Sequence, residues 1–295
     1  MKEVGIVIVT YNRIKLLIEV IESLRLQTYT NSQIIVVNNG STDDTLSWLN
    51  KQEDIITITQ ENLGGAGGFF TGMKYVAENG YKYCWVMDDD VICSPTALEE
   101  LYNVYQLKEN IGFVCSKVIG IDGCPMNTPN IDLRPSSNGY ADWLSMIEYN
   151  MIKVQMATFV SVFLSTERIY ELGLPFKEFF IWGDDSEYTL RLSNKYECFV
   201  VGKSIVTHKR AIQAALSFDK ETDSKRLQNF YYSFRNWGYV STKSSIKRKF
   251  KYYIKHLMLV LKYFIKGQPL KSRIIIKSLY SLLTFDPIIS FPNKQ

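Results

Sequence analysis

Short apolar segments that resemble strands alternate with segments of helical periodicity over residues 4–90, and this alternation constrains the fold most. The segment "VGIVIVT" (4–10) is apolar and β-branched at successive positions, as expected of a strand that is covered on both faces. Residues 13–27 then carry apolar side chains at helical spacing, and the same order recurs up to "YKYCWVMDDD" (81–90). This alternation predicts an α/β fold with a mostly parallel, Rossmann-like central sheet flanked by helices.

Polar motifs follow four of the predicted strands. They are "TYNR" (10–13), "NNGSTDD" (38–44), "ENLGGAGG" (61–68) and "DDD" (88–90). In open α/β sheets, ligands bind beyond the carboxyl ends of the strands. We therefore expect the four motifs to meet at one rim of the sheet and to form a single site.

The aspartate triplet is the most distinctive of these motifs. Side chains alternate along a strand, so Asp88 and Asp90 can face one way while Asp89 faces the other. Two carboxylates on one side suit Mg²⁺ or Mn²⁺, which take oxygen ligands. The alternative is a solvated acidic turn. The position of the triplet directly after an apolar strand favours the metal.

The glycine-rich stretch places four glycines among residues 64–68, ahead of a predicted helix. Such a loop lets backbone N–H groups approach a phosphate or a sugar closely, and a helix N-terminus favours an anion. Asn62 in this loop is a candidate contact to a base or a ribose. The alternative is an ordinary glycine-rich turn, because neither GxGxxG nor a P-loop is present.

A second acidic motif, "FFIWGDDSEYTLR" (179–191), places Asp184, Asp185 and Glu187 at the start of a predicted helix. Carboxylates cap helix N-termini, so capping is the alternative to a role in a pocket. One aspartate can cap while the other acts as a base towards a sugar hydroxyl. Trp182 offers a face on which a sugar ring could stack, although buried aromatic residues more often belong to the core.

Two further residues have weaker support. His208, at the end of the last predicted strand, is either a metal ligand or an ordinary surface or core histidine. Arg235 lies in "NFYYSFRNWGYV" (229–240), which is either a packed amphipathic helix or a helix whose arginine reaches a phosphate.

The charge of the chain is unevenly distributed. Residues 1–223 contain 19 Lys and Arg against 29 Asp and Glu, whereas residues 224–285 contain 14 Lys and Arg and no acidic residue. Lysines and bulky apolar residues alternate at helical spacing over 244–267, which suits a helix lying on an anionic membrane. A basic face on a packed helix and nucleic-acid binding are the alternatives. No run is apolar and long enough to predict a transmembrane helix.

The five cysteines form neither a zinc-ligand pattern nor a disulfide framework, which favours a reducing compartment. The apolar run at the N-terminus is too short for a signal peptide and is interpreted as the first strand.

Taken together, these motifs resemble the inverting GT-A glycosyltransferases of family 2. The resemblance covers residues 3–210 and runs in the expected order. The combination of "NLGGAGGF", "MDDD" and "WGDDSE" is most similar to the galactofuranosyltransferase branch. The sequence departs from the family at "NNGS", where many members have an aspartate that contacts the base or the ribose.

The resemblance implies roles for individual residues. Asp185 would be the catalytic base. Asp88, Asp90 and His208 would hold Mn²⁺ or Mg²⁺. Trp182, Asp184 and Glu187 would contact the acceptor or the donor sugar. The remaining donor contacts would come from Thr10, Tyr11, Arg13, Asn39, Asn62, Gly65, Asp88 and Asp89.

The implied reaction transfers galactofuranose from its UDP donor to a hydroxyl of a lipid-linked or growing cell-surface polysaccharide. Transfer of rhamnose or another hexose is the alternative within the family. A nucleotidyltransferase is disfavoured because "VTYNR" is not the Gly-rich, basic loop that such an enzyme carries after its first strand. A non-catalytic glycan- or membrane-binding module would not need both acidic motifs.

The predicted organisation is a GT-A catalytic domain over 1–215, with a donor half over 1–120 and an acceptor half over 121–215. A basic helical region over 216–295 would serve membrane association or oligomerisation. The expected partners are a UDP-sugar, a glycan or lipid-linked acceptor and an anionic membrane surface. The expected location is cytoplasmic and peripheral, at the inner face of the plasma membrane.

Overall fold

The structure is a computed structural model that describes residues 2–210, 216–243 and 245–293, without the side chain of Lys225. The chain forms two compact units. The first comprises Met1–Lys177, Asp185–Gln213 and Ile289–Gln295, and the second comprises Glu178–Asp184 and Ala214–Ile288. The predicted boundary between residues 215 and 216 falls at 211–215, outside the described residues.

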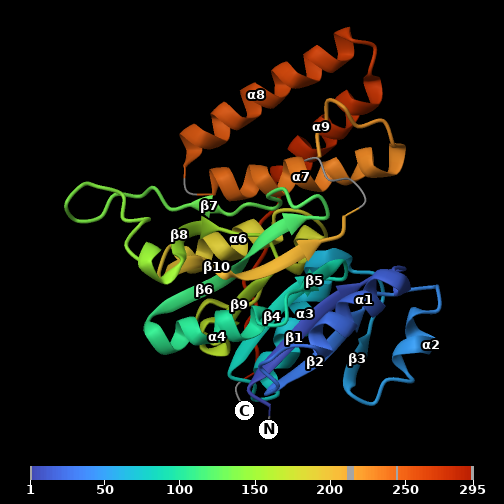
Figure 1. The fold of residues 1–295 in the computed structure, drawn as a ribbon. Coiled ribbons are helices and arrows are strands. Elements are labelled where there is room, and N and C mark those ends of the chain that lie inside the picture. Colours follow the sequence, from blue (N-terminus) through green and yellow to red (C-terminus); the bar gives the residue numbers. More distant parts are fainter. Residues whose placement is uncertain (1, 211–215, 244, 294–295) are drawn as a thin grey trace. The chain divides into compact units, whose positions relative to one another are not determined.

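A large sheet forms the centre of the first unit (Figure 1), with the path β3-β2-β1-β4-β9-β6-β10-β8-β7 and with β5 paired to β10. Its strands are β1 (Val4–Thr10), β2 (Ser32–Asn38), β3 (Ile55–Thr59), β4 (Tyr83–Asp88), β5 (Val91–Cys93), β6 (Ile111–Gly120), β7 (Asn130–Ile131), β8 (Met151–Met156), β9 (Val162–Ser165) and β10 (Glu197–His208). The strands β3, β2, β1 and β4 are mutually parallel. Beyond β4, β9 runs antiparallel to both of its neighbours. The sheet is therefore mixed, and the predicted parallel arrangement holds for its N-terminal half.

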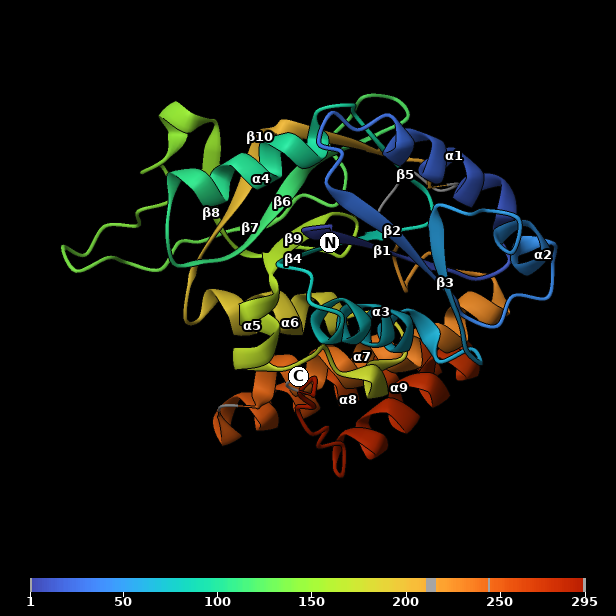
Figure 2. The same ribbon diagram turned by 90° about the horizontal axis from the view of Figure 1, so that it is seen from below.

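Helices cover both faces of this sheet. The helices of the first unit are α1 (Ile14–Arg25), α2 (Thr45–Leu49), α3 (Gly64–Glu78), α4 (Ala97–Leu107), α5 (Thr166–Leu172) and α6 (Asp184–Ser193, whose first residue belongs to the second unit), with short 3₁₀ turns at Ile147–Tyr149 and Lys177–Phe179. Figure 2 shows α1 and α4 on one face and α3, α5 and α6 on the other. Alternate residues of β1 serve the two layers: Ile6 and Ile8 pack with α1, whereas Val7 packs with α3. This explains why the segment is apolar at successive positions.

Buried serines join β6, β10 and the residue before β9. Ser116 on β6 shares hydrogen bonds of 2.7 Å with Ser161, just before β9, and with Ser204 on β10. Trp85 on β4 donates its indole N–H to Ser161 at 2.9 Å. Because buried polar groups are costly unless they are paired, this network favours one position of β10 beside β6.

The second unit contains the helices α7 (Ser224–Thr242), α8 (Ile246–Ile265) and α9 (Pro269–Leu282). Leu227 and Phe230 of α7 pack with Ile274 of α9, and Tyr263 of α8 packs with Ile275 and Leu279 of α9. The helical character expected of the C-terminal region is thus confirmed. Among the described residues, no helix combines the length and the apolar character needed to cross a bilayer.

Candidate active site

Strand pairing brings the ends of β1, β4 and β10 together. β1 and β4 are parallel neighbours in which Val9 pairs with Asp88, so Thr10 lies beside the start of the aspartate triplet. After β4 the chain turns at Asp89 and Asp90 and enters β5, which pairs antiparallel with the end of β10 so that Val91 is opposite His208. The carboxyl ends of three strands therefore supply one cluster of polar side chains.

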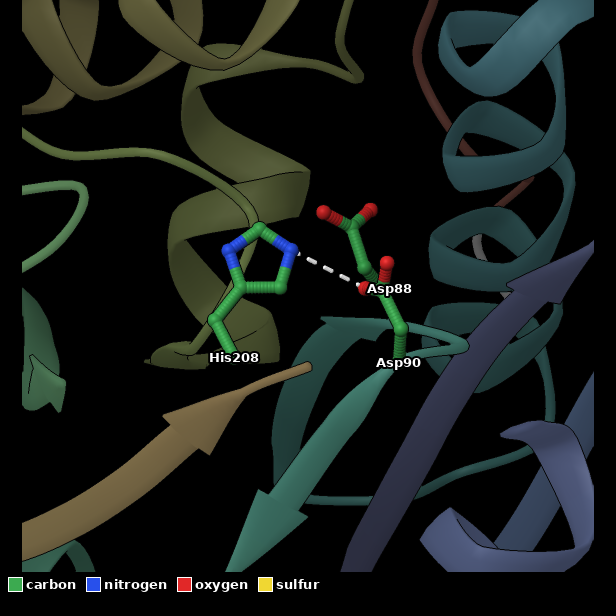
Figure 3. Close-up of side chains that lie close together, drawn as sticks. All are labelled: Asp88, Asp90 and His208. Atoms are coloured by element: carbon green, nitrogen blue, oxygen red, sulfur yellow. Dashed lines mark ion pairs between the residues drawn. The ribbon is translucent and has the colours of Figure 1, made fainter. Parts of the chain in front are cut away.

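Asp88, Asp90 and His208 form the centre of this cluster (Figure 3), and one potential ligand atom from each lies within 4.8 Å of the others. Asp90 and His208 are buried and Asp88 is half-buried. His208 Nε2 lies 3.0 Å from Asp90 Oδ1. The predicted metal ligands are thus brought to one point from two distant parts of the chain.

The hydrogen bond on the other side of the His208 ring determines what Nε2 can do. His208 Nδ1 lies 2.9 Å from Asn127 Oδ1. With the amide oxygen assigned to this contact, Nδ1 carries a proton, and in the neutral form of the ring Nε2 presents a lone pair. That lone pair faces Asp90 Oδ1, a buried atom that receives no aligned hydrogen bond from the described residues. A protonated Nε2 would donate to Asp90 in this position, whereas an unprotonated Nε2 needs a cation that both atoms can ligate. Two carboxylates with an imidazole fit Mn²⁺ or Mg²⁺.

The electrostatics of the triplet agree with this fit. Burial and then the nearby carboxylate of Asp90 raise the pKa of Asp88 to about 7. Burial opposes the charged form of Asp90, but His208 and Arg13 keep the pKa of Asp90 below its ordinary value. Clustered carboxylates that repel one another are stabilised by a cation, so the position favours a divalent metal.

Asp89 faces away from this cluster, towards β1. Its Oδ2 accepts a hydrogen bond of 2.8 Å from the Thr10 hydroxyl, and its Oδ1 lies 3.1 Å from Arg13 Nη1. The same Nη1 lies 3.0 Å from Asp90 Oδ2, although about half of the Arg13 side chain is exposed. Burial raises the pKa of Asp89 to about 6, against the opposing effect of Arg13. Asp89 therefore fixes Thr10 and Arg13 at the rim, next to the exposed side chain of Tyr11.

Asn39 is buried and holds the stretch that follows β3. Its Oδ1 accepts hydrogen bonds from Gln60 Nε2 (2.8 Å) and from the Leu63 N–H (3.1 Å). Its Nδ2 donates to the Gly64 carbonyl at 2.9 Å. Asn62 is exposed, and its Oδ1 accepts from the Gly64 N–H at 2.9 Å. Both amides therefore hold the backbone of the segment that leads into α3.

The prediction of a glycine-rich loop over 64–68 is wrong, because α3 begins at Gly64 and these glycines lie in its first turns. A Cβ atom at Gly68 would lie 2.3 Å from Val9 Cγ1, and one at Gly72 would lie 2.2 Å from Val7 Cγ1. These two glycines let α3 pack closely on β1. A Cβ atom at Gly65, by contrast, would meet nothing within 4 Å, so this part of the helix start is open.

Asp185 and Glu187 lie in the first turn of α6. Asp185 is half-buried, and its Oδ1 accepts a hydrogen bond of 2.6 Å from the Ser186 N–H. Glu187 is buried and pairs with Arg191 at 2.7 Å. Arg191 also donates to the carbonyl of Leu172 at 2.7 Å, so the pair ties α6 to the end of α5.

Trp182 and Asp184 belong to the 178–184 segment of the second unit. Phe180 and Trp182 have positive φ angles of 63° and 62°, a strained conformation for bulky residues. Trp182 packs against Phe230 of α7 with ring centroids 5.1 Å apart. Asp184 is buried at the start of α6.

Two residues of α7 hold this strained segment. Asn236 is fully buried, and its Nδ2 donates to the carbonyls of Phe179 (2.9 Å), Ile181 (3.1 Å) and Trp182 (2.7 Å). Arg235 is also buried, donates to the Glu178 carbonyl at 2.7 Å and lies over the Phe285 ring. The guanidinium that the sequence suggested for a phosphate is thus used for backbone carbonyls.

Sequence reasoning missed Asn127 and Asn236. Asn127 lies in an irregular stretch, with a φ angle of 46°, and only the fold brings it to His208. Asn236 is one polar residue in an aromatic helix. An asparagine within an aromatic helix is a signal that could have been noticed, because its amide needs hydrogen-bond partners wherever it is buried.

Comparisons with known proteins agree with this geometry. Residues 5–164 match the model of the family described as "Glycosyl transferase family 2". The chain is 32% identical over 110 residues to the glycosyltransferase GlyG of Streptococcus pneumoniae, covering 36% of each protein. It is 36% identical over 88 residues to the galactofuranosyltransferase GlfT1 of Mycobacterium tuberculosis, covering 28% of this chain and 29% of that protein. The matched segments thus span about a third of these relatives' own lengths.

Solved structures show the same fold. S. aureus TarS (residues 1–349) superposes with a TM-score of 0.56 at 13% identity, over 98% of this chain and 96% of that one. GalNAc-T7, solved with UDP, GalNAc and Mn²⁺, superposes with a TM-score of 0.56 at 12% identity, over 80% and 49%.

The superpositions confirm the predicted GT-A fold class, with its helical C-terminal region, and the family match confirms the predicted family. Because the family model matches more than half of the sequence, this chain belongs to glycosyl transferase family 2.

Proposed function

We propose that this chain is a metal-dependent, inverting glycosyltransferase that moves galactofuranose from UDP-galactofuranose onto a hydroxyl of a lipid-linked or growing cell-surface polysaccharide. The observation that carries the proposal is the contact between His208 Nε2 and Asp90 Oδ1 beside Asp88, because this cluster fits a divalent cation. The similarity to a galactofuranosyltransferase supports the choice of donor.

In this proposal Asp88, Asp90 and His208 hold Mn²⁺ or Mg²⁺. The presence of Mn²⁺ with UDP in the GalNAc-T7 structure, which has the same fold, supports this assignment. When bound, the ion would supply Lewis-acid stabilisation to the negative charge of the departing diphosphate. Asn127 orients the His208 ring for this role through the hydrogen bond at Nδ1.

The donor is held at the rim formed by the ends of β1, β2 and β4. Arg13 is fixed by Asp89 and Asp90, yet half of its side chain is exposed, so it is placed to contact a phosphate oxygen. Tyr11 is exposed beside it and offers a ring face to the uracil. The further donor contacts in this proposal are Thr10, Asn39, Asn62, Gly65, Asp88 and Asp89.

Asp185 acts as the general base. It takes the proton of the acceptor hydroxyl as that oxygen forms a bond to the anomeric carbon. The bond from the anomeric carbon to the diphosphate oxygen breaks in the same step, and UDP leaves from the opposite face. A single displacement of this kind inverts the anomeric configuration. Trp182, Asp184 and Glu187 are assigned to the sugar and the acceptor.

We also propose that residues 1–215 form the catalytic domain, with donor and acceptor halves over 1–120 and 121–215. The basic helical region over 216–295 would bring the enzyme to an anionic membrane at the inner, cytoplasmic face of the plasma membrane. The absence of acidic residues over 224–285 supports this role.

A donor panel tests the proposal. Purified chain is incubated with UDP-galactofuranose, UDP-galactose, UDP-glucose and dTDP-rhamnose, each with Mn²⁺, with Mg²⁺ or with EDTA, and nucleotide release is measured. The proposal expects metal-dependent release of UDP that is fastest with UDP-galactofuranose. Release only from dTDP-rhamnose or from another hexose donor would overturn the donor assignment. No release from any donor would overturn the catalytic assignment.

A further inference from the structure

One face of α8 exposes a continuous stripe of large apolar side chains. Eight residues of this helix, which we name the α8 stripe, are between 42% and 88% exposed: Ile246, Phe250, Ile254, Leu257, Met258, Leu261, Phe264 and Ile265. At 3.6 residues per turn these positions fall on an arc of about 120°. The opposite side of α8, including Tyr252, His256 and Tyr263, packs inside the second unit, which we call the helical unit. The stripe is therefore a surface of its own and not the exposed edge of the core.

A row of lysines runs along one side of the stripe. Lys251, Lys255, Lys262 and Lys266 are exposed and follow one another at helical spacing. Lys262 lies 3.4 Å from Asp219, and residues 224–285 contain no acidic residue. An apolar face flanked by lysines is typical of a helix that lies in the interface of an anionic bilayer.

The helical unit also contains a cavity at the N-terminal end of α8. It has a volume of about 860 Å³ and is lined by lysines 243, 247 and 249, by apolar side chains that include Leu282 and Phe285, and by one acid, Asp286. Ile246 belongs both to the cavity wall and to the α8 stripe, so the two features adjoin. Lysines beside apolar walls suit an amphipathic anion, such as the phosphate and the upper acyl chain of a phospholipid.

We propose that α8 lies in the surface of an anionic phospholipid bilayer, with the α8 stripe among the acyl chains, and that the lysine-lined cavity takes the phosphate headgroup of one anionic lipid. This inference rests on the proposed membrane association and names the residues that make it. A second copy of the chain is a poorer occupant, because a symmetric contact through α8 would bring two rows of lysines together. Nucleic acid would leave the apolar stripe without a partner.

Vesicle flotation tests the inference on the full chain. The vesicles are phosphatidylcholine alone or an equal mixture of phosphatidylcholine and phosphatidylglycerol. We expect wild type to float with the mixed vesicles and to bind pure phosphatidylcholine at least about tenfold more weakly, since several lysines of α8 would lie near the anionic surface. If wild type binds neither vesicle, the proposed membrane association itself is wrong.

Variants separate the inference from that broader proposal. The stripe variant is Leu257→Asp/Leu261→Asp, and its matched control is Leu26→Asp/Leu107→Asp, which alters exposed leucines of the first unit. The stripe variant should lose at least about tenfold in vesicle binding, whereas the control should bind like wild type. Wild-type binding by the stripe variant would overturn the inference and leave membrane association through another surface. UDP release without vesicles should be equal in all three proteins, which shows that the variants are folded. If the stripe variant has lost this activity, Leu257→Ser/Leu261→Ser replaces it.

The cavity has its own variant and competitor. Lys247→Glu/Lys249→Glu should weaken the preference for phosphatidylglycerol, although the α8 stripe and the lysine row beside it are intact. Inorganic phosphate added to wild type should not displace the vesicles if the cavity binds a lipid headgroup together with part of its acyl chain. Displacement by phosphate, or an unchanged lipid preference in the variant, would overturn the lipid site.

If wild type elutes as a dimer in size-exclusion chromatography and the stripe variant elutes as a monomer, the stripe is a contact between copies, which would overturn the inference.

Discussion

His208 Nε2 lies 3.0 Å from Asp90 Oδ1, and the pairing of two strands far apart in the sequence places them there. β5 follows the aspartate triplet directly and aligns Val91 opposite His208 at the end of β10. The cluster is therefore a product of the fold, and its function depends on residues that orient the two side chains.

Asn127 provides the clearest test of that orientation. Replacing it with alanine removes the acceptor at His208 Nδ1 and frees the ring to change tautomer. We expect Asn127→Ala to weaken the apparent affinity for Mn²⁺ by about 10- to 100-fold, the usual effect of losing such a partner. A Mn²⁺ titration of UDP release should recover most of the activity at saturating metal.

The control for this test is Asn79→Ala, which removes an exposed amide that donates to the nearby Tyr75 carbonyl. It should leave the titration unchanged. An Asn127→Ala protein with the wild-type affinity for Mn²⁺ would contradict the orienting role.

The base assignment predicts a specific loss in Asp185→Asn. The amide keeps the size of the side chain but cannot accept the proton of the acceptor hydroxyl. We expect kcat to fall by about 10²- to 10⁴-fold with the donor KM nearly unchanged. Steady-state kinetics should be compared with those of Asp142→Asn, an exposed acid of the first unit. Full turnover in folded Asp185→Asn would remove the assignment.

Asn236 should contribute to stability through the carbonyls that it satisfies. Asn236→Ala leaves three buried or half-buried carbonyls without this donor in a strained segment. We expect the free energy of unfolding to fall by about 1–3 kcal/mol. Denaturant titration measures this, with Asn79→Ala as the exposed control. Equal stability of the two variants would show that the strained segment is held by other contacts.

Glu221 predicts a pH dependence of the helical unit. Hydrogen bonds from Arg226, and from the backbone N–H groups of Asp223 and Thr222, lower the pKa of Glu221 from 4.5 to about 2. A carboxyl whose pKa is lowered on folding stabilises the protein above its unfolded value, and this contribution is lost as the pH falls from about 4.5 to 2. Glu221→Gln should therefore unfold more readily than wild type at pH 7, and thermal unfolding curves should converge towards pH 2. A difference that does not change with pH would contradict the charge-based explanation.

The sequence predicted the donor half of the fold well because each element there carries its own periodicity. β1 lies at the predicted residues 4–10, and α1 falls inside the predicted 13–27. Asp88 and Asp90 meet at one point while Asp89 faces β1, as expected, although Asp89 and Asp90 lie in the turn after β4 and not in the strand itself.

Other features could not be predicted because they depend on contacts between distant segments. Glycine disfavours helices, yet α3 already begins at Gly64, and Gly68 and Gly72 let that helix approach β1 closely. The pairing of β5 with β10 and the contact between Asn127 and His208 have no local signal. Arg235 faces carbonyls of the 178–184 segment, which no property of its own helix indicates.

Isothermal titration calorimetry of UDP into the purified chain, with and without Mn²⁺, measures whether the Asp88, Asp90 and His208 cluster holds a metal that binds the nucleotide. Wild type should bind UDP much more tightly with Mn²⁺ than with EDTA. In His208→Ala and Asp90→Asn, the affinity for UDP in the presence of Mn²⁺ should fall by at least about 100-fold. Asp122→Asn, which changes an exposed acid, should bind UDP with Mn²⁺ like wild type. Equal UDP affinity with and without Mn²⁺ in the folded wild type would contradict the account.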